Sequence, residues 1–118
     1  MTNVYSRTYD TLLGLGYPVR EQGAYAATEA LPETFCTYQV IDQIDSSHAD
    51  NRSASMTSSI QVSLYSRRPA IVQQADQTLR AAMIPAGFLR AGGRNMPLDR
   101  DTGHYGYVST YNFYDSEE

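Results

Sequence analysis

Alternate residues of two segments, 35–44 and 60–66, are apolar, with polar residues between them along most of each segment. This period of two is typical of strands that bury one face of a sheet. The pattern therefore predicts two strands of a half-buried antiparallel sheet. The alternating apolar residues are Cys36, Tyr38 and Val40 in the first segment and Ile60, Val62 and Leu64 in the second.

Two other segments repeat their apolar residues at helical spacing. The pattern predicts a first helix over residues 3–13, capped by Thr2 or Asn3 and ended by glycines. A second helix is predicted from the residues after Ser66 to about Ile84, with Pro69 in its first turn. The apolar faces are Tyr5, Tyr9, Leu12 and Leu13 in the first helix, and Ile71, Val72, Ala75, Thr78, Leu79, Ala82 and Met83 in the second.

The remaining segments give shorter predicted elements. Residues 17–28 read as a short strand followed by an irregular connection. After the second helix we predict a short strand at 88–90, a turn at 91–93 and a polar excursion over 95–103. A last strand, 104–114, carries an aromatic face that we expect to pack under a helix. Those aromatic residues are Tyr105, Tyr107, Tyr111 and Phe113.

The segment 45–59 is rich in serine and, apart from Met56, holds hardly any large apolar side chain. A connection of this length in a compact domain is usually functional or disordered. We predict a mobile contact arm here, ordered only on binding a partner. The alternative is a second strand that starts earlier, near Ser55, with a correspondingly shorter loop.

Together these elements predict one domain, 1–118, of the α+β class. We expect a mostly antiparallel sheet of four to five strands with two helices packed on one face, because a sheet face and amphipathic helices complete a two-layer core. The chain has 118 residues, a length typical of one domain.

Charge and hydropathy narrow the class of partners. Thirteen acidic residues stand against nine basic ones, all arginine, for a formal charge of −4. An acidic chain without a basic cluster is poorly suited to grip nucleic acid, although it suits a pore through which DNA slides. No apolar run is long enough to span a membrane, and the first residues lack a signal-peptide pattern. We expect synthesis in a cytosol and no membrane partner.

Few residues offer chemistry. Cys36 falls on the apolar face of a strand, which predicts a buried, reduced thiol. No spaced metal-ligand pair, calcium loop, nucleophile elbow or phosphate-binding loop is present. We therefore expect no catalytic site, no cofactor and no metal, and interpret the possible ligands as solvated loop residues. Those residues are His48, Asp50, Asp99, Asp101 and His104.

Arg67 and Arg68 stand at the start of the predicted second helix. Positive charge at a helix N-terminus opposes the helix dipole. One interpretation is an external partner, such as an acidic patch on a neighbouring subunit. The other is an acidic residue of the same chain, and the sequence does not choose between them.

Five motifs, in this order, resemble the tail terminator proteins of long-tailed, non-contractile bacteriophages, also called tail completion or head-tail joining proteins. They cover nearly the whole chain. The motifs are Gly16-Tyr17-Pro18-Val19, Phe35-Cys36-Thr37-Tyr38-Gln39, Ala49-Asp50-Asn51, Gln61-Val62-Ser63-Leu64-Tyr65-Ser66 and the tyrosine-containing last strand.

The resemblance implies a structural virion protein that assembles with itself into a ring, usually hexameric. Such a ring caps the finished tail tube and then docks to head completion or connector proteins, with DNA passing through its lumen. It would be made in the host cytoplasm and end in the virion, at the tail and neck. Two alternatives are a head-completion stopper or adaptor of the same virion, and a small-molecule-binding α+β domain. Our interface candidates are His48, Asp50, Asn51, Arg52, Arg67, Arg68, Asp99 and Asp101.

Overall fold

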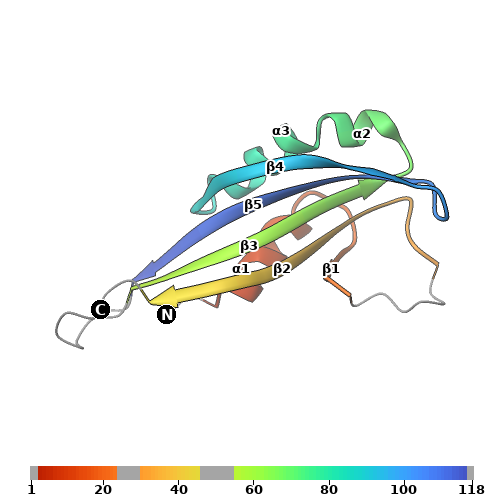
Figure 1. Ribbon diagram of the computed structural model, residues 1–118. Helices are drawn as coiled ribbons and strands as arrows, with labels where there is room; N and C mark the ends of the chain where they lie inside the picture. Colours follow the sequence, from red (N-terminus) through yellow and green to blue (C-terminus); the bar gives the residue numbers. More distant parts are fainter. Residues whose placement is uncertain (1–2, 24–29, 46–54, 117–118) are drawn as a thin grey trace.

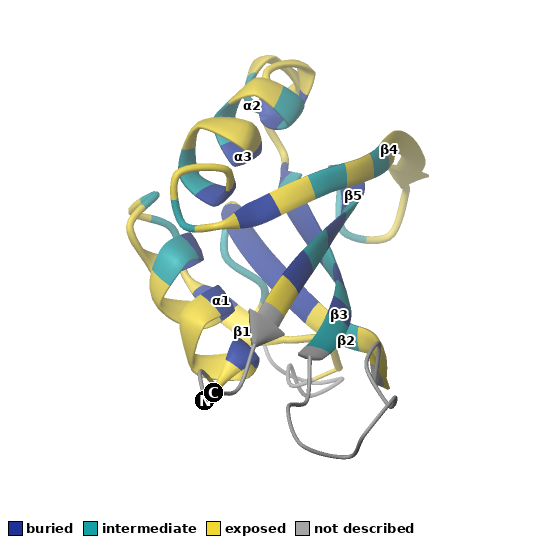
Figure 2. Cartoon of the chain, turned by 90° about the vertical axis from the view of Figure 1, so that its left-hand side faces the viewer, coloured by how far each residue is buried: buried dark blue, intermediate teal, exposed yellow. Residues whose placement is uncertain are grey.

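The computed structural model describes residues 3–23, 30–45 and 55–116. In this part of the chain a five-stranded sheet has the order β1-β2-β3-β5-β4, and the helices cover one of its faces (Figures 1 and 2). β1 runs parallel to β2 and the other pairings are antiparallel, so the predicted α+β class is confirmed. The elements are α1 (Val4–Leu13), β1 (Val19–Glu21), β2 (Thr34–Asp45), β3 (Ser55–Ser66), α2 (Pro69–Gln73), α3 (Ala75–Met83), β4 (Phe88–Asp99) and β5 (His104–Ser116).

The core lies between the helices and the sheet face that we call the helix face. Cys36 pairs with Leu64, and Leu64 pairs with Tyr107, so their side chains share this face. The predicted inward faces of these strands are therefore confirmed, and so is the burial of Cys36. This burial raises the pKa of the Cys36 thiol to about 12. The buried core residues of the helices are Val4, Leu12, Val72, Ala75, Leu79 and Met83.

The first helix is confirmed, but of its predicted apolar face only Leu12 is buried. Asn3 caps α1 through its Oδ1, which accepts hydrogen bonds from the backbone N–H groups of Tyr5 and Ser6. The buried side chains are Val4, Thr8 and Leu12, whereas Tyr5 is exposed. Thr8 is tolerated in the core because its hydroxyl donates to the Val4 carbonyl at 2.7 Å, which satisfies the buried polar group. Tyr9 and Leu13 are also exposed.

The second helix is interrupted rather than continuous. Pro69 begins α2 as predicted, but Gln74 leaves the helical region with φ −102° and ψ 7°. Its N–H reaches the carbonyls of both Ile71 and Val72, so the chain tightens at this point before α3 begins. Val72 before the break and Leu79 after it are both buried.

The strand predicted at 88–90 is confirmed, but the turn predicted at 91–93 is wrong, and so is the excursion predicted from 95 up to the turn that follows Asp99. β4 is one strand from Phe88 to Asp99, paired with β5, with a register shift between Arg90 and Gly92. The glycines favoured a turn in the sequence, yet pairing with β5 satisfies the backbone and keeps the segment extended. A short turn follows, in which Gly103 has φ +79°.

The second central strand starts earlier than our main prediction. β3 begins at Ser55 and pairs with both β2 and β5, so the alternative start near Ser55 is confirmed and the 45–59 loop was overestimated. The shorter connection, 46–54, lies outside the described residues. The prediction that it becomes ordered on binding stays untested.

The paired ends of β2, β3 and β5 project beyond α2 and α3, at the lower left of Figure 1. We call this projection the sheet arm, made of residues 41–45, 55–59 and 112–116. It contributes to the elongated shape of the molecule, whose principal extents are 52 × 29 × 23 Å. No helix among the described ranges combines the length and apolarity that crossing a membrane requires.

Candidate functional site

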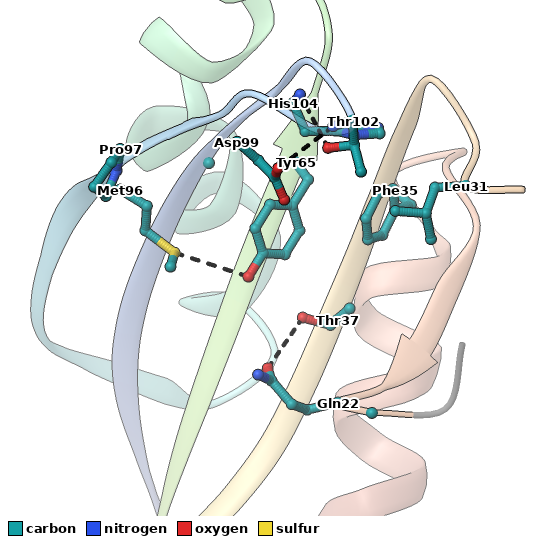
Figure 3. A pocket seen from close by; sticks show the side chains of 12 residues that line it. Gln22, Leu31, Phe35, Thr37, Tyr65, Met96, Pro97, Asp99, Thr102 and His104 are labelled. Atoms are coloured by element: carbon teal, nitrogen blue, oxygen red, sulfur yellow. Dashed lines mark hydrogen bonds between the residues drawn. The ribbon is translucent and has the colours of Figure 1, made fainter. Parts of the chain in front are cut away.

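A cavity of about 380 Å³ opens on the sheet face opposite the helices, which we call the open face (Figure 3). It lies where β2 and β5 begin and β3 ends. Phe35 and Tyr65 form its floor, with stacked rings whose centroids lie 5.1 Å apart. The residues that line it are Gln22, Gly23, Leu31, Phe35, Thr37, Tyr65, Met96, Pro97, Asp99, Thr102, His104 and Gly106.

Strand register builds this cavity. Phe35 pairs with Tyr65, Tyr65 with Gly106 and Gly106 with Met96, so these positions form one row across four strands. A Cβ atom on Gly106 would lie 2.9 Å from the Tyr65 ring, so glycine leaves the space that the ring occupies. The Tyr65 hydroxyl in turn contacts the Met96 sulfur at 3.8 Å.

His104 is not the solvated loop residue that we predicted. Its side chain is 3% exposed, with Nε2 2.8 Å from the Pro32 carbonyl oxygen and the ring edge-on to Phe35 at 5.2 Å. Its Nδ1 atom is buried and has no hydrogen-bond partner among the described residues. The contacts hold the imidazole as a wall of the cavity.

The polar groups of the cavity are largely engaged with one another. Asp99 Oδ1 accepts from the backbone N–H groups of Asp101 and Thr102 at 2.9 and 3.4 Å, which fixes the turn into β5. Thr37 donates to Gln22 at 3.4 Å. The remaining lining is aromatic and aliphatic, a surface suited to an apolar side chain or small apolar ligand. In the described ranges, no three His, Cys, Asp or Glu side chains gather as metal ligands.

The predicted interface candidates fall in two places. Asp99 is the last residue of β4, and Asp101 lies in the turn that follows it. Arg67 contacts the same turn, since its Nε donates to the Thr102 carbonyl at 2.9 Å. Arg68 is exposed at the start of α2, with its backbone N–H bound to Ser66 Oγ. His48, Asp50, Asn51 and Arg52 lie outside the described residues.

The contact of Arg67 bears on the open question about its partner. The group that it reaches is in the same chain, as one of our two interpretations had it, but it is a backbone carbonyl rather than a carboxylate. The guanidinium therefore ties the end of β3 to the β4–β5 turn.

Sequence reasoning missed a polar cluster between α3 and the sheet. Asp76 Oδ1 accepts from Arg90 Nε at 2.8 Å and from the Tyr107 hydroxyl at 2.9 Å, and Asp76 Oδ2 accepts from Arg80 at 2.9 Å. The Asp76–Arg80 spacing of four residues is a visible signal for a helical ion pair. The contacts to Arg90 and Tyr107 carried no local signal, since they depend on the register of β4 and β5.

Two pKa values report how the cluster is balanced. Desolvation pushes the pKa of Asp76 upward, but hydrogen bonds from Tyr107 and Arg90 outweigh it and hold that pKa below 3.8. The hydrogen bonds with Tyr107 and Asp76 raise the pKa of Arg90 above its ordinary value. Both groups therefore stay charged, and the cluster joins α3 to β4 and β5.

Replacing Asp76 with asparagine is expected to lower the free energy of unfolding at neutral pH by about 1 kcal/mol, since the lost hydrogen bonds involve charge but the carboxylate is partly exposed. The native pKa lies below the unfolded one, so the unfolded chain binds more protons and the contribution of Asp76 vanishes as pH falls through the native pKa. Urea unfolding at several pH values measures this.

The control is Asp10→Asn, which removes an exposed carboxylate from α1. We expect the gap between the wild type and Asp76→Asn to shrink below about pH 4, because the wild type then protonates Asp76 and loses the ionised carboxylate that the variant already lacks. A gap that stays constant down to acid pH, or an equal loss in Asp10→Asn, contradicts the role given to the cluster.

The sequence was also compared with known proteins. No protein-family model matches the chain. The search of curated proteins likewise gives no match.

Proposed function

We propose that this chain is a structural virion protein, a tail terminator subunit that caps the phage tail tube as a ring and offers a docking surface for head completion proteins. Hexameric closure is the form that the sequence resemblance implies. The α+β architecture is also the one implied by the resemblance, and it supports the proposal. The chain acts by binding, in the host cytoplasm during assembly and in the neck of the finished virion.

The observation that carries the proposal is an exposed apolar patch that spans the sheet arm and the start of β4. Thr57 pairs with both Ile44 and Tyr114, and Asn112, two residues before Tyr114, pairs with Leu89. These positions share the open face, since strand residues two apart point the same way. Ile44, Leu89 and Tyr114 are 57%, 54% and 59% exposed. Clustered apolar exposure of this kind marks protein-binding surfaces.

Charge fits the passage of DNA rather than its capture. The formal charge of −4 disfavours retention of a phosphate backbone. Among the nine arginines, several bind groups of their own chain, including Arg7, Arg67, Arg80 and Arg90. In a ring, such a subunit presents a lumen through which DNA moves as cargo.

The open-face cavity favours a second candidate, a domain that binds a small apolar ligand. Its volume of about 380 Å³ falls within the range of ligand sites. Binding of an apolar fluorescent dye that is lost on Gly106→Leu, which fills the floor, would favour this candidate. If the chain is a tail terminator, we expect it to assemble without such a ligand.

The test of the main proposal mixes the purified protein with assembled tail tubes that lack a cap. We expect rings at one end of each tube, seen by electron microscopy, and no further growth when tube subunits are added. Ile44→Asp combined with Tyr114→Asp should abolish capping because buried carboxylates without partners are costly. Ile84→Asp, at an exposed position outside the arm, is the matched control and should cap normally.

Two results would contradict the proposal. Tubes that keep growing in the presence of the wild-type protein exclude capping. Attachment to filled heads that lack tails, without binding to tubes, identifies the protein instead as a head-completion stopper or adaptor.

A further inference from the structure

The sheet ends in two strands whose outer edges are largely unpaired in the described part of the chain. β1 covers β2 only through the pairs from Cys36 to Tyr38, with Gln22 N–H reaching the Tyr38 carbonyl just beyond them. In the described part of the chain, residues 39–45 of β2 therefore pair with β3 on one side and have no strand on the other. β4 is the outer strand at the other end of the sheet. Unpaired edges of this length are templates for pairing with another strand.

The two edges run in opposite directions. β2 is antiparallel to β3, β3 to β5 and β5 to β4, so β2 and β4 point opposite ways. A second copy rotated about an axis along the strands then brings its β4 beside β2 in antiparallel orientation. Repeating this rotation therefore continues the sheet from one subunit to the next, with all subunits pointing the same way.

The edges also lie at matching heights along the strands. Gln43 connects to Phe88 through the pairs with Ser58 and Phe113. Gln39 connects to Gly92 in the same way, through Gln61 and Thr110. Rotation about an axis along the strands preserves height, so residues 39–43 of one copy meet residues 88–92 of the next. Each stretch contains a bulge, between Val40 and Asp42 in β2 and between Arg90 and Gly92 in β4, and a bulge increases the local twist of its strand.

The side chains on the two edges complement each other. In the described part of the chain, the free edge of β2 carries the exposed Asp42 and no arginine, whereas β4 carries the exposed Arg94 just past residues 88–92, with Arg90 held by Asp76 of its own chain. Ile41 is 51% exposed, as Leu89 is 54%. Opposite charges beside exposed apolar groups on two edges favour contact between copies of this chain.

We propose that residues 39–43 of β2 pair with residues 88–92 of β4 in a second copy of this chain, as a head-to-tail interface that continues the sheet. A head-to-tail contact of this kind closes into a ring when its rotation divides the circle. The inference rests on the proposed function, because it supplies the contact between neighbouring subunits of the ring. The pairing stops at residue 39 of β2, because β1 already occupies the edge from Cys36 to Tyr38.

Asp42 and Leu89 provide the test. Both are exposed, and the pairs through Ser59 and Asn112 place them at one height on the open face. Neighbouring strands bring Cα atoms within disulfide range. One sample carries Asp42→Cys, a second carries Leu89→Cys, and the two are mixed at high protein concentration under oxidising conditions. Cys36 stays inert because it is fully buried with a pKa of about 12.

We expect disulfide-linked dimers in the mixture and none in either sample alone. A single chain carrying both substitutions should give a ladder that ends at the ring. Leu98→Cys in place of Leu89→Cys is the matched control, because Leu98 is exposed at the far end of the same strand, and it should not link to Asp42→Cys. Circular dichroism checks that every variant is folded.

Three outcomes overturn the inference. Dimers within a single-variant sample show a two-fold symmetric contact. Oligomers by light scattering without cross-links in the mixture show that the ring uses other surfaces, and a protein that stays monomeric shows that the edges do not pair. The proposed function fails separately, when the cross-linked ring forms but does not bind tail tubes.

Discussion

Replacing Phe88 with alanine is expected to lower the free energy of unfolding by about 3–5 kcal/mol, the usual cost of deleting a buried phenylalanine side chain. Phe88 is fully buried at the start of β4, and its ring centroid lies 5.0 Å from that of Phe113. The Arg7 guanidinium of α1 lies over the Phe113 ring at 5.2 Å. The loss therefore loosens contacts among β4, β5 and α1.

Leu89→Ala is the matched control, because the next residue of the same strand is 54% exposed. We expect it to change stability by less than about 0.5 kcal/mol. Urea unfolding followed by tyrosine fluorescence measures both variants. Since a domain of this size has a total stability of about 5–15 kcal/mol, Phe88→Ala should unfold well below the wild-type midpoint. Equal losses at the two positions contradict the assignment of Phe88 to the core.

The elements that the sequence predicted correctly are those with local signals. The period of two around Cys36 and Val62 identified the central strands because one face of each is buried. Asn3 marked the start of α1 because its side chain caps free backbone N–H groups. The aromatic face of β5 was likewise assigned correctly to the core, and Tyr111 is fully buried there.

The errors arose where distant contacts override a local preference. Tyr5 and Tyr9 repeat at helical spacing, yet α1 packs on the sheet with Val4 and Thr8 inward, and the Val4 carbonyl satisfies the hydroxyl of Thr8 there. Gly92 and Gly93 are typical of a turn, but β5 holds them in a strand. Such outcomes depend on packing partners far along the chain, which single-sequence patterns do not contain.

The candidate site was the hardest part to predict. His104 was assigned to solvent because it follows a polar turn, whereas Pro32 and Phe35, some seventy residues earlier in the chain, bury it. The row from Phe35 to Gly106 depends on strand register, which local sequence does not set. The same dependence hid the contact between Asp76 and Arg90. Arg67 was identified as a residue in need of a partner, but not the carbonyl that it reaches.

The second large effect is expected at Gly93. A Cβ atom there would lie 2.8 Å from Tyr107 Cζ and 3.0 Å from Arg90 Nη2. Tyr107 is buried and its hydroxyl binds both Asp76 and Arg90, so the ring has little room to move. Glycine is therefore required because the aromatic side chain of the neighbouring strand crosses over this position of β4.

Gly93→Ala is expected to lower the free energy of unfolding by about 1–3 kcal/mol, the usual cost of overpacking a well-packed site. It should also reduce the stability that Asp76 adds above acid pH, because displacement of Tyr107 removes one of the hydrogen bonds of the cluster. Gly92→Ala is the matched control: a Cβ atom there meets nothing within 4 Å, and alanine is easily accommodated in a strand.

Tyr107→Phe in the Gly93→Ala background should cost less than the sum of the two single changes, since the substitutions share one contact. Equal unfolding midpoints for Gly92→Ala and Gly93→Ala, or strict additivity with Tyr107→Phe, would show that the Tyr107 ring does not constrain β4.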